Sequence, residues 1–306
     1  MSGILITGGS GFLGQALARR LLDLGHDRVC IYSRGEMAQH LMYETFKRDE
    51  RLRMFIGDVR DRQRLRMAME GCEYVIHTAA LKRVEVGESN PHEMVKTNVN
   101  GAANVIEAAF EACVRRVVSI SSDKACEPLN AYGTSKLMAE KMFLAANNVH
   151  GERGPSYAVV RYGNVGGSTG SVIPLWRRLA AAGQRVQVTD LEATRFWISV
   201  AEAVALVLWA LESDVTMAVP DLPSYRLGDL VEAMAVEANV VGLGPGEKKH
   251  ETMLSEAEGV SFYEPDTAPG YWVRPRKGAG EWAPALISSR AWRLSVAEIK
   301  ERLADV

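Results

Sequence analysis

The chain has 306 residues, enough for one large domain or two smaller ones at about 150 residues per domain. Hydrophobic residues make up 47% and charged residues 24%, a globular composition that excludes disordered, collagen-like and coiled-coil chains. The net charge is -2, and no dense Lys/Arg run is interleaved with aromatic residues, which argues against a nucleic-acid partner. The longest uncharged apolar run, residues 203–211, falls well short of the roughly 20 residues that a membrane span needs.

The N-terminus passes from Met1 into the apolar run 4–6 without a basic leader, so we expect a cytoplasmic protein. The cysteines form no C-x-x-C pair, and the histidines show no paired spacing. Neither a disulfide framework nor a metal site is expected from this pattern.

The first half of the chain alternates short β-branched apolar runs with longer amphipathic stretches. The runs predict strands at 4–7, 28–32, 53–56, 74–78, 116–120 and 157–161. The amphipathic stretches predict helices at 12–24, 62–69, 91–112 and 131–147. Strand and helix alternating in this way predict an α/β fold with a doubly wound parallel sheet, which we assign to a first domain at residues 1–163.

The rhythm changes after residue 163, where the predicted elements are shorter and more widely spaced. They fall at 174–182, 200–211, 215–219 and 227–238. We expect a smaller second domain over residues 164–306, from which a strand or helix could return to the first domain. Prolines and glycines crowd residues 259–284 and predict an irregular loop. Ser295 and Glu298 have capping-box spacing and predict a final helix through Leu303.

Three glycines follow the first predicted strand in a G-x-x-G-x-x-G pattern, at Gly8, Gly11 and Gly14. Residues without a Cβ permit a tight turn and let the backbone approach a pyrophosphate, whose charge then meets the positive end of the helix. A plain strand-to-helix turn also uses glycine. At the start of a strand–helix–strand unit, however, the pattern favours dinucleotide binding.

The second predicted strand ends in Tyr32, Ser33 and Arg34, where an NAD site usually carries an acidic residue. A hydroxyl and a guanidinium can instead hold a 2′-phosphate, so NADP is favoured over NAD, and the alternative is a solvated arginine. Asp58, after the third strand, could accept a hydrogen bond from the adenine amino group or form an Asx turn.

Tyr132 and Lys136 are spaced i and i+4, on one face of a predicted helix. A tyrosine that serves as a base at neutral pH needs its phenolate stabilised, and a nearby lysine together with a nicotinamide cation could supply that charge. Ser121 and Ser122 end a predicted strand ten residues upstream. A tyrosine packed beside a surface lysine is the alternative, but the glycine motif and the serines favour a catalytic group.

With these motifs the chain resembles the extended short-chain dehydrogenase/reductase superfamily, whose members combine a Rossmann domain with a C-terminal sugar-nucleotide domain. The segment from Ser121 through Asp123 and Lys124 to Tyr132 and Gly133 narrows the resemblance. It is similar to that of the soluble UDP-N-acetylglucosamine 4,6-dehydratases that invert C5, enzymes of the first step toward pseudaminic acid. Further similar segments lie at 77–82, 96–98, 161–165, 194–198 and 246–251.

The resemblance implies a role for each residue of the catalytic segment. Tyr132 would take the C4 hydroxyl proton while hydride passes to the nicotinamide, with Ser122 and Lys136 beside it. Lys124 would remove the C5 proton and Asp123 would protonate the departing C6 hydroxyl, which requires opposite protonation states side by side. Without the resemblance, Asp123 and Lys124 would be taken as a surface ion pair.

The resemblance also implies binding residues. Cofactor contacts are expected from Gly8, Ser10, Gly11, Phe12, Leu13, Gly14, Ser33, Arg34, Asp58, Val59, Ala79, Ala80, Tyr132 and Lys136. Substrate contacts are expected from Lys82, Asn98, Asn164, Arg195 and Glu251. Arg195 could clamp the diphosphate, Asn98 could instead tie a helix to the active-site loop, and Glu251 could be a solvated loop charge.

Two residues depart from the family pattern. Ser122 stands where threonine is usual and keeps the hydroxyl, whereas Thr169 stands where arginine is usual and removes a cation near the expected diphosphate channel. The rival predictions are a nucleotide-sugar 4-epimerase, which needs no acid at C6, and a non-catalytic dinucleotide sensor. A homo-oligomer packed through the helices at 91–112 and 131–147 is also expected.

Overall fold

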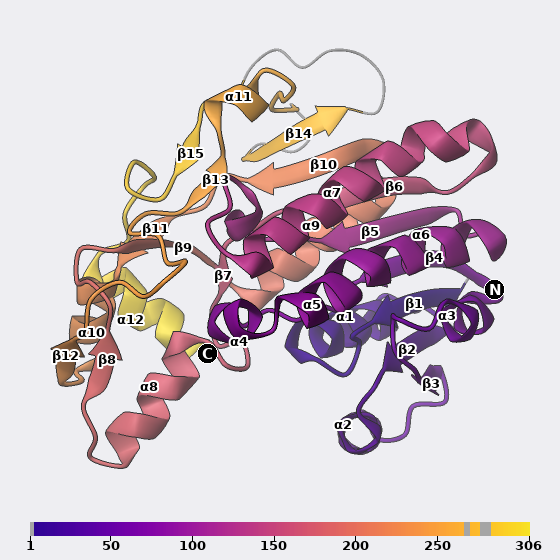
Figure 1. Cartoon of the computed structure of the whole chain (residues 1–306). Helices are drawn as coiled ribbons and strands as arrows, with labels where there is room; N and C mark the ends of the chain where they lie inside the picture. Colours follow the sequence, from indigo (N-terminus) through magenta and orange to yellow (C-terminus); the bar gives the residue numbers. More distant parts are fainter. Residues whose placement is uncertain (1–2, 266–269, 276–282) are drawn as a thin grey trace.

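The computed structural model describes residues 3–265, 270–275 and 283–306 of the chain. Its centre is an eight-stranded sheet covered by helices (Figure 1). The strands lie in the order β14 (Tyr271–Pro275), β10 (Val215–Pro220), β6 (Ser156–Val160), β5 (Arg116–Ile120), β4 (Cys72–His77), β1 (Gly3–Thr7), β2 (Val29–Ser33) and β3 (Leu52–Ile56). All neighbours pair in parallel except β14, which is antiparallel to β10. The predicted doubly wound α/β fold is confirmed.

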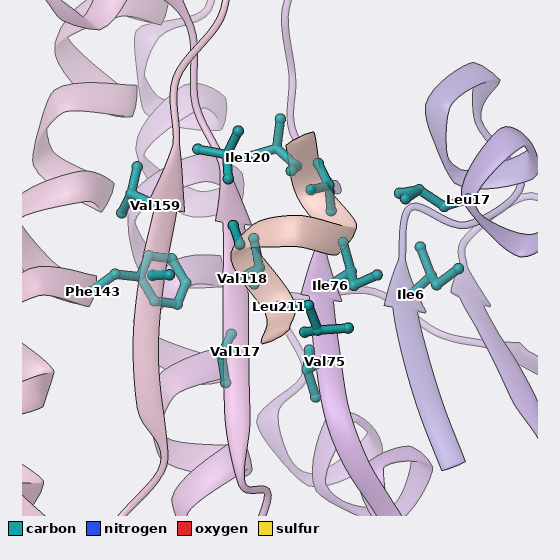
Figure 2. Packing of buried hydrophobic residues seen from close by; sticks show 14 of the residues in the cluster. Ile6, Leu17, Val75, Ile76, Val117, Val118, Ile120, Phe143, Val159 and Leu211 are labelled. Atoms are coloured by element: carbon teal, nitrogen blue, oxygen red, sulfur yellow. The ribbon is translucent and has the colours of Figure 1, made fainter. Parts of the chain in front are cut away.

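The sheet is buried because its central strands are continuous apolar runs with helices packed on them. The helices of this part are α1 (Phe12–Asp23), α2 (Glu36–Thr45), α3 (Arg62–Met69), α4 (Val84–Ser89), α5 (Pro91–Met94), α6 (Gly101–Glu111), α7 (Ala131–His150) and α9 (Val200–Glu212). Helices α3, α6 and α7 pack side by side, and α1 packs against α9. Figure 2 shows Phe143 of α7 and Leu211 of α9 against the strand residues Val117, Val118 and Ile76.

The helix predicted at 91–112 is not regular. Between α5 and α6 the chain forms a π-helical turn, Val95–Asn100, in which Thr97 and Asn98 are buried. Such turns widen a helix by one residue and are frequent at functional sites.

Residues beyond 163 divide between two hydrophobic cores. Helix α9 and strands β10 and β14 extend the large sheet and its core. The second core is formed around α8 (Val172–Ala181), β8 (Val186–Val188), α10 (Leu227–Met234) and α12 (Val296–Ala304). The remaining elements are β7 (Asn164–Val165), β9 (Thr194–Ile198), β11 (Ser224–Arg226), β12 (Ala238–Val240), β13 (Thr252–Leu254), α11 (Glu256–Gly259) and β15 (Leu286–Ile287).

The predicted capping box is confirmed, because Ser295 and Glu298 exchange the two reciprocal hydrogen bonds at the start of α12. The irregular loop expected over 259–284 is wrong at residues 271–275, which form β14 at the edge of the sheet. Proline is tolerated at an edge, and Pro275 ends this strand. The rest of that prediction falls partly outside the described residues. Helix α10 ends earlier than predicted, because Ala235 adopts a left-handed conformation.

Candidate active site

A cavity of about 1350 Å³ opens along the ends of the central strands and continues to the second core's loops. Open α/β sheets bind ligands at this edge. All twelve cofactor residues predicted outside α7 line it: Gly8, Ser10, Gly11, Phe12, Leu13, Gly14, Ser33, Arg34, Asp58, Val59, Ala79 and Ala80. Ser122, Lys124, Tyr132 and Lys136 line it as well, together with Lys82, Asn164, Arg195 and Glu251.

The glycine-rich turn leaves room for a phosphate group at the start of α1. Gly8 has a φ of +67°, and a Cβ there would lie 2.9 Å from the backbone of Ala79. A Cβ at Gly14 would lie 2.5 Å from Gly9, so α1 can approach the turn only with glycine there. Gly11 is the N-cap residue of α1 and has no side chain to bond the first N–H groups of the helix. These N–H groups therefore remain available to an anion. These residues fit a dinucleotide.

At the far end of this turn, Ser33 and Arg34 lie beside Asp58. The Ser10 hydroxyl donates to Ser33 Oγ at 2.8 Å, and Gln39 donates to the same oxygen at 2.9 Å. Asp58 accepts from the backbone N–H of Arg60 at 3.0 Å, which is the Asx turn, and its other oxygen pairs with the Arg60 guanidinium at 2.7 Å. Arg34 is exposed and lies 3.7 Å from Asp58. Its guanidinium therefore faces the cavity rim next to the Ser33 hydroxyl.

The catalytic candidates lie on helix α7 and on the loop 122–130 that joins it to strand β5, where Asp123–Ala125 form a 3₁₀ turn. Tyr132 and Lys136 are both buried on the first two turns of α7. Burial raises the pKa of Tyr132, although a hydrogen bond with Ser122 and the charge of Lys124 act in the opposite direction. Burial lowers the pKa of Lys136 to about 8, and its Nζ donates to the Ile120 carbonyl at 2.5 Å. The charge of Lys124, which the sequence assigned only to C5, thus also acts on the phenol.

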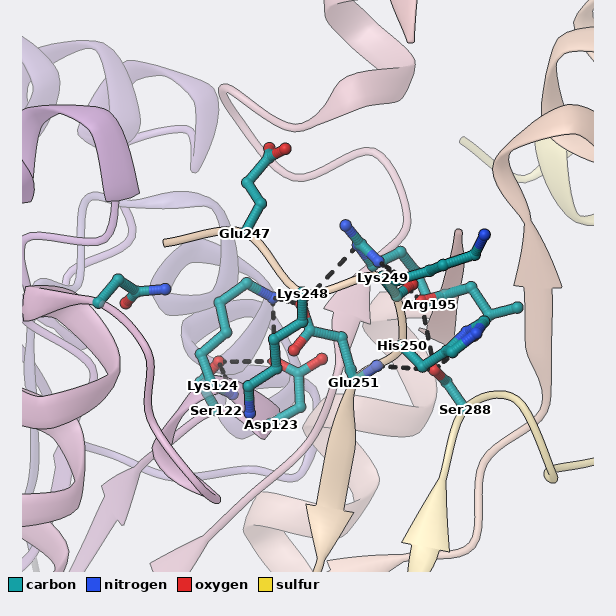
Figure 3. Close-up of polar contacts among 12 residues, drawn as sticks. Ser122, Asp123, Lys124, Arg195, Glu247, Lys248, Lys249, His250, Glu251 and Ser288 are labelled. Carbon is teal, nitrogen blue, oxygen red and sulfur yellow. Dashed lines mark hydrogen bonds and ion pairs between the residues drawn. The ribbon is translucent and has the colours of Figure 1, made fainter. Parts of the chain in front are cut away.

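Asp123 and Lys124 lie side by side, as Figure 3 shows, with Lys124 in the cavity lining and Asp123 behind it. Oδ1 of Asp123 accepts from the Ser122 hydroxyl at 2.9 Å and from Lys124 Nζ at 3.1 Å. Asp123 is 1% exposed and sits behind these two side chains, outside the cavity lining of the described residues. Its Oδ2 is buried and has no hydrogen-bond partner in the described part of the chain. A proton held by Asp123 therefore needs Lys124 or Ser122 to move before it reaches a ligand.

A second carboxylate approaches the same ammonium from the other half of the chain. Oε1 of Glu251 lies 3.2 Å from Lys124 Nζ and 3.8 Å from the Arg195 guanidinium. Glu251 is 2% exposed, and its Oε2 has no partner among the described residues. Its backbone is fixed by Ser288, whose hydroxyl accepts from the Glu251 N–H at 2.9 Å. Burial would lower the pKa of Lys124, but the charges of Asp123 and Glu251 outweigh it and raise that pKa.

Four of the five predicted substrate residues lie at the cavity, and one does not. Lys82, Asn164, Arg195 and Glu251 line the cavity, and burial lowers the pKa of Lys82. Asn98 lies outside the lining formed by the described residues. Its amide accepts from the Leu81 N–H at 2.8 Å and donates to the Leu81 carbonyl and Ser135 Oγ at 2.9 Å. Asn98 thus ties the π-helical turn to the loop that follows β4.

Two arginines that sequence reasoning missed also line the cavity, Arg83 and Arg178. A Cβ added at Gly170 would lie 3.3 Å from the Arg83 guanidinium, next to Thr169. Arg83 thus places a cation close to the position at which Thr169 departs from the family pattern. The sequence signal that could have found Arg83 is its position directly after Lys82, a predicted substrate residue. Among the described residues, no His, Cys, Asp and Glu side chains are grouped to hold a metal ion, and no helix there is long and apolar enough to span a bilayer.

Residues 4–268 match the family described as polysaccharide biosynthesis protein, and the chain belongs to this family. Among its relatives, the inverting UDP-N-acetylglucosamine 4,6-dehydratase of Campylobacter jejuni is 43% identical over 267 residues, covering 85% of this chain and 80% of that protein. The UDP-glucose 4-epimerase of Rickettsia massiliae is 35% identical and covers 98% of this chain and 94% of its own length.

Solved structures agree with the fold. Pen from Bacillus thuringiensis superposes with a TM-score of 0.93 at 33% identity, over 99% of this chain and 97% of that one. The dTDP-glucose 4,6-dehydratase DesIV of Streptomyces venezuelae, solved with NAD and TYD, has a TM-score of 0.72 at 22% identity, over 80% and 86% of the two chains. At that identity the likeness concerns the fold alone.

Proposed function

We propose that the protein is an NADP-dependent nucleotide-sugar 4,6-dehydratase that acts on UDP-N-acetylglucosamine with inversion at C5. The observation that carries the proposal is the placement of Asp123 and Lys124 next to Ser122 and Tyr132 at one cavity wall. The identity to the inverting dehydratase of Campylobacter jejuni supports the substrate and the inversion.

Each proton transfer in the proposed reaction has a group in the site. A bound nicotinamide dinucleotide supplies hydride acceptance from C4 and hydride return to C6. Tyr132 takes the proton of the C4 hydroxyl, with Ser122 in hydrogen-bond contact. The C4 ketone makes the C5 hydrogen acidic. Lys124 moves toward C5 to remove that proton, and the Asp123 carboxyl that this movement uncovers gives a proton to the departing C6 oxygen as water.

The resting protonation states of Asp123 and Lys124 are the reverse of those that elimination needs. The ammonium and the carboxylate share a hydrogen bond of 3.1 Å, so one proton moving from Lys124 Nζ to Asp123 Oδ1 supplies a neutral amine and a carboxylic acid together. After elimination the amine holds the C5 proton and the carboxyl is ionised again. The resting pair is thereby restored without a proton from solvent. As hydride returns to C6, a proton adds to C5 on the face opposite the one that lost it, and loss of the C4 hydroxyl proton held by Tyr132 balances that addition.

The NADP preference rests on Ser33 and Arg34 at the end of β2. These residues bring a hydroxyl and a guanidinium to the cavity, and β2 contains no carboxylate that would take the place of a 2′-phosphate. We assign residues 164–306 chiefly to the sugar-nucleotide side, because Asn164, Arg195 and Glu251 come from them. We also propose a homo-oligomer through α6 and α7, on which Phe110 and Met138 are exposed apolar side chains.

The test is to incubate the purified protein with UDP-N-acetylglucosamine and NADP and to follow product mass and C5 configuration by NMR. Loss of one water with inversion at C5 is the expected result. Loss of water with retained C5 would overturn the inversion alone, and no loss of water would overturn the dehydratase.

A 4-epimerase is the second candidate, favoured by the 35% identity to the Rickettsia enzyme along almost the whole chain. It predicts unchanged mass with altered configuration at C4. The buried acid at Asp123 has no function in that reaction, which is why dehydration is preferred.

A further inference from the structure

Residues 246–251, here called the strap, cross over the loop 122–130 and bring Glu251 to Lys124 (Figure 3). Gly246, Glu247, Lys248 and Glu251 of the strap line the cavity. The strap lies between β12 and β13, more than a hundred residues along the chain from the loop that it covers. Its position is therefore fixed by tertiary contacts and not by local sequence.

One of these contacts comes from Asn130, the N-cap of α7. Its Oδ1 accepts from the Gly133 N–H at 2.7 Å, and its Nδ2 donates to the Gly246 carbonyl at 2.8 Å. Asn130 is buried, so both bonds are formed away from bulk water. An N-cap needs only an acceptor, which aspartate, serine and threonine also supply. The second bond needs a donor on the same side chain, and of these residues only asparagine carries an amide.

The strap backbone is shaped to this contact. Gly246 has a φ of +75°, and a Cβ at that position would lie 2.9 Å from the Asn130 Cβ. Any larger residue there would be strained and would push Asn130 away. A second bond fixes the strap to the same loop, because Lys248 Nζ donates to the Cys126 carbonyl at 2.8 Å.

We propose that Asn130 is a positioning residue that couples the strap to the start of α7, so that nucleotide-sugar binding and the orientation of Tyr132 depend on each other. Tyr132 lies two residues after the cap, inside the first turn that the Asn130 side chain closes. Glu251 lies at the other end of the strap, against Lys124. The proposal rests on the proposed function for its substrate, and on the described contacts alone for the coupling.

The test compares Asn130→Asp with Asn130→Ala. Aspartate has the same shape and keeps the acceptor for Gly133, but it places an oxygen opposite the Gly246 carbonyl. Alanine removes both bonds. Asp61→Asn is the matched control, because Asp61 caps α3 through the Arg64 N–H at 2.9 Å and lies outside the cavity lining of the described residues.

For Asn130→Asp we expect a melting temperature a few degrees below that of the wild type, because a buried bond is lost, with unchanged NADP affinity. We also expect a rise of about tenfold in KM for UDP-N-acetylglucosamine that exceeds the fall in kcat. Hydrogen–deuterium exchange should speed up at strap amides 247–251, while the Gly133 amide stays protected. Asp61→Asn should leave KM and strap exchange at wild-type values.

Two outcomes would overturn the coupling. The first is a wild-type KM or wild-type exchange of the strap amides in Asn130→Asp. The second is that the Gly133 amide loses protection equally in Asn130→Asp and Asn130→Ala, which would make Asn130 a helix cap only. The exchange measurement needs no substrate. If the wild-type enzyme fails to dehydrate UDP-N-acetylglucosamine, the proposed function fails while strap exchange still decides the role of Asn130.

Discussion

The carboxylate of Glu251 and the ammonium of Lys124 meet at 3.2 Å, although 126 residues separate them in the chain. The contact joins the second part of the protein to the end of β5, where the proposed base lies. Asp123 approaches the same ammonium at 3.1 Å, so two carboxylates hold one cation. The protonation state of Lys124 consequently depends on both parts of the chain.

Glu251→Gln should shift the pH dependence of turnover. Burial acts to lower the pKa of Lys124, but Asp123 and Glu251 together raise it. Removal of one carboxylate lowers that pKa, so the Lys124–Asp123 pair loses the proton that elimination needs at lower pH. We expect the basic limb of kcat/KM against pH to move down by about one unit, the scale of one nearby charge.

Glu247→Gln is the control for this shift, because Glu247 lines the same cavity and accepts from the Gly244 N–H at 3.1 Å. The limb of the kcat/KM profile of Glu247→Gln should stay at the wild-type pH. A basic limb that stays in place in Glu251→Gln would show that Glu251 does not act on Lys124.

Asp123→Asn and Lys124→Ala should each abolish water loss while NADP still binds. Each removes one partner of the proton exchange across the 3.1 Å hydrogen bond. General acid–base groups contribute about 10²- to 10⁴-fold to rate, so product mass analysis should detect a fall of that size. Cofactor titration monitors the binding site separately, and full activity in either variant would refute its role.

Lys136→Met should reduce activity at least about 100-fold without loss of stability at pH 7 in the cofactor-free protein. Burial lowers the pKa of Lys136 from 10.5 to about 8, so the charged form is disfavoured by folding and stability rises with pH between these values. Methionine removes that cost, about 3 kcal/mol by linkage, and loses the bond to Ile120. Urea denaturation measures the balance, and a large drop in midpoint would contradict it.

Arg34→Ala should weaken NADP binding about tenfold or more and change NAD binding little, because a 2′-phosphate loses its cation. Arg34 is exposed at the cavity rim, and its guanidinium lies 3.7 Å from Asp58. Arg62→Ala is the charge-matched control, since Arg62 pairs with Glu107 away from the cavity. Calorimetric titration of both cofactors gives the comparison, and equal losses for NADP and NAD would reject the 2′-phosphate site.

Glu258→Gln should reduce stability at neutral pH and weaken the dependence of stability on pH in acid. Burial would raise the pKa of Glu258, but hydrogen bonds and charge from the buried Arg161 outweigh it and lower that pKa to about 2. A carboxyl whose folded pKa lies below its unfolded value of 4.5 contributes stability above that value and loses it as pH falls toward 2. We expect up to about 3 kcal/mol less stability at pH 7 and a flatter decline between pH 4.5 and 2, measured by urea denaturation at each pH.

Local patterns predicted much of the structure and the cofactor end of the site. Gly8 and Gly14 were predictable because a strand, a turn and a helix follow one another directly. Tyr132 and Lys136 share one helix face by spacing alone. The edge strand β14 was missed because its pairing with β10 is non-local, and prolines and glycines around it indicate a loop.

The contacts of the ionisable groups could not be predicted. Glu251 was expected to touch a ligand, but the position of its carboxylate at Lys124 depends on how the strap packs on the loop 122–130. Asp58 had two interpretations: the Asx turn forms, because the Arg60 N–H lies two residues on, and the adenine contact stays a prediction. Asn98 ties a helix to the loop after β4, as one interpretation of the sequence predicted, but its partners Leu81 and Ser135 lie on two separate segments that no spacing rule relates to it.

The π-helical turn Val95–Asn100 restricts how this part of the gene can vary in length. A π turn holds one residue more than an α turn, and the surplus sets the rotation of α5 against α6. Deletion of one codon here would still permit two helices but would turn one against the other by about 100°. Asn98 would then face away from Ser135. Insertions and deletions should therefore be tolerated in the exposed turn around Gly25, where an added side chain meets no atom, and not in this buried segment.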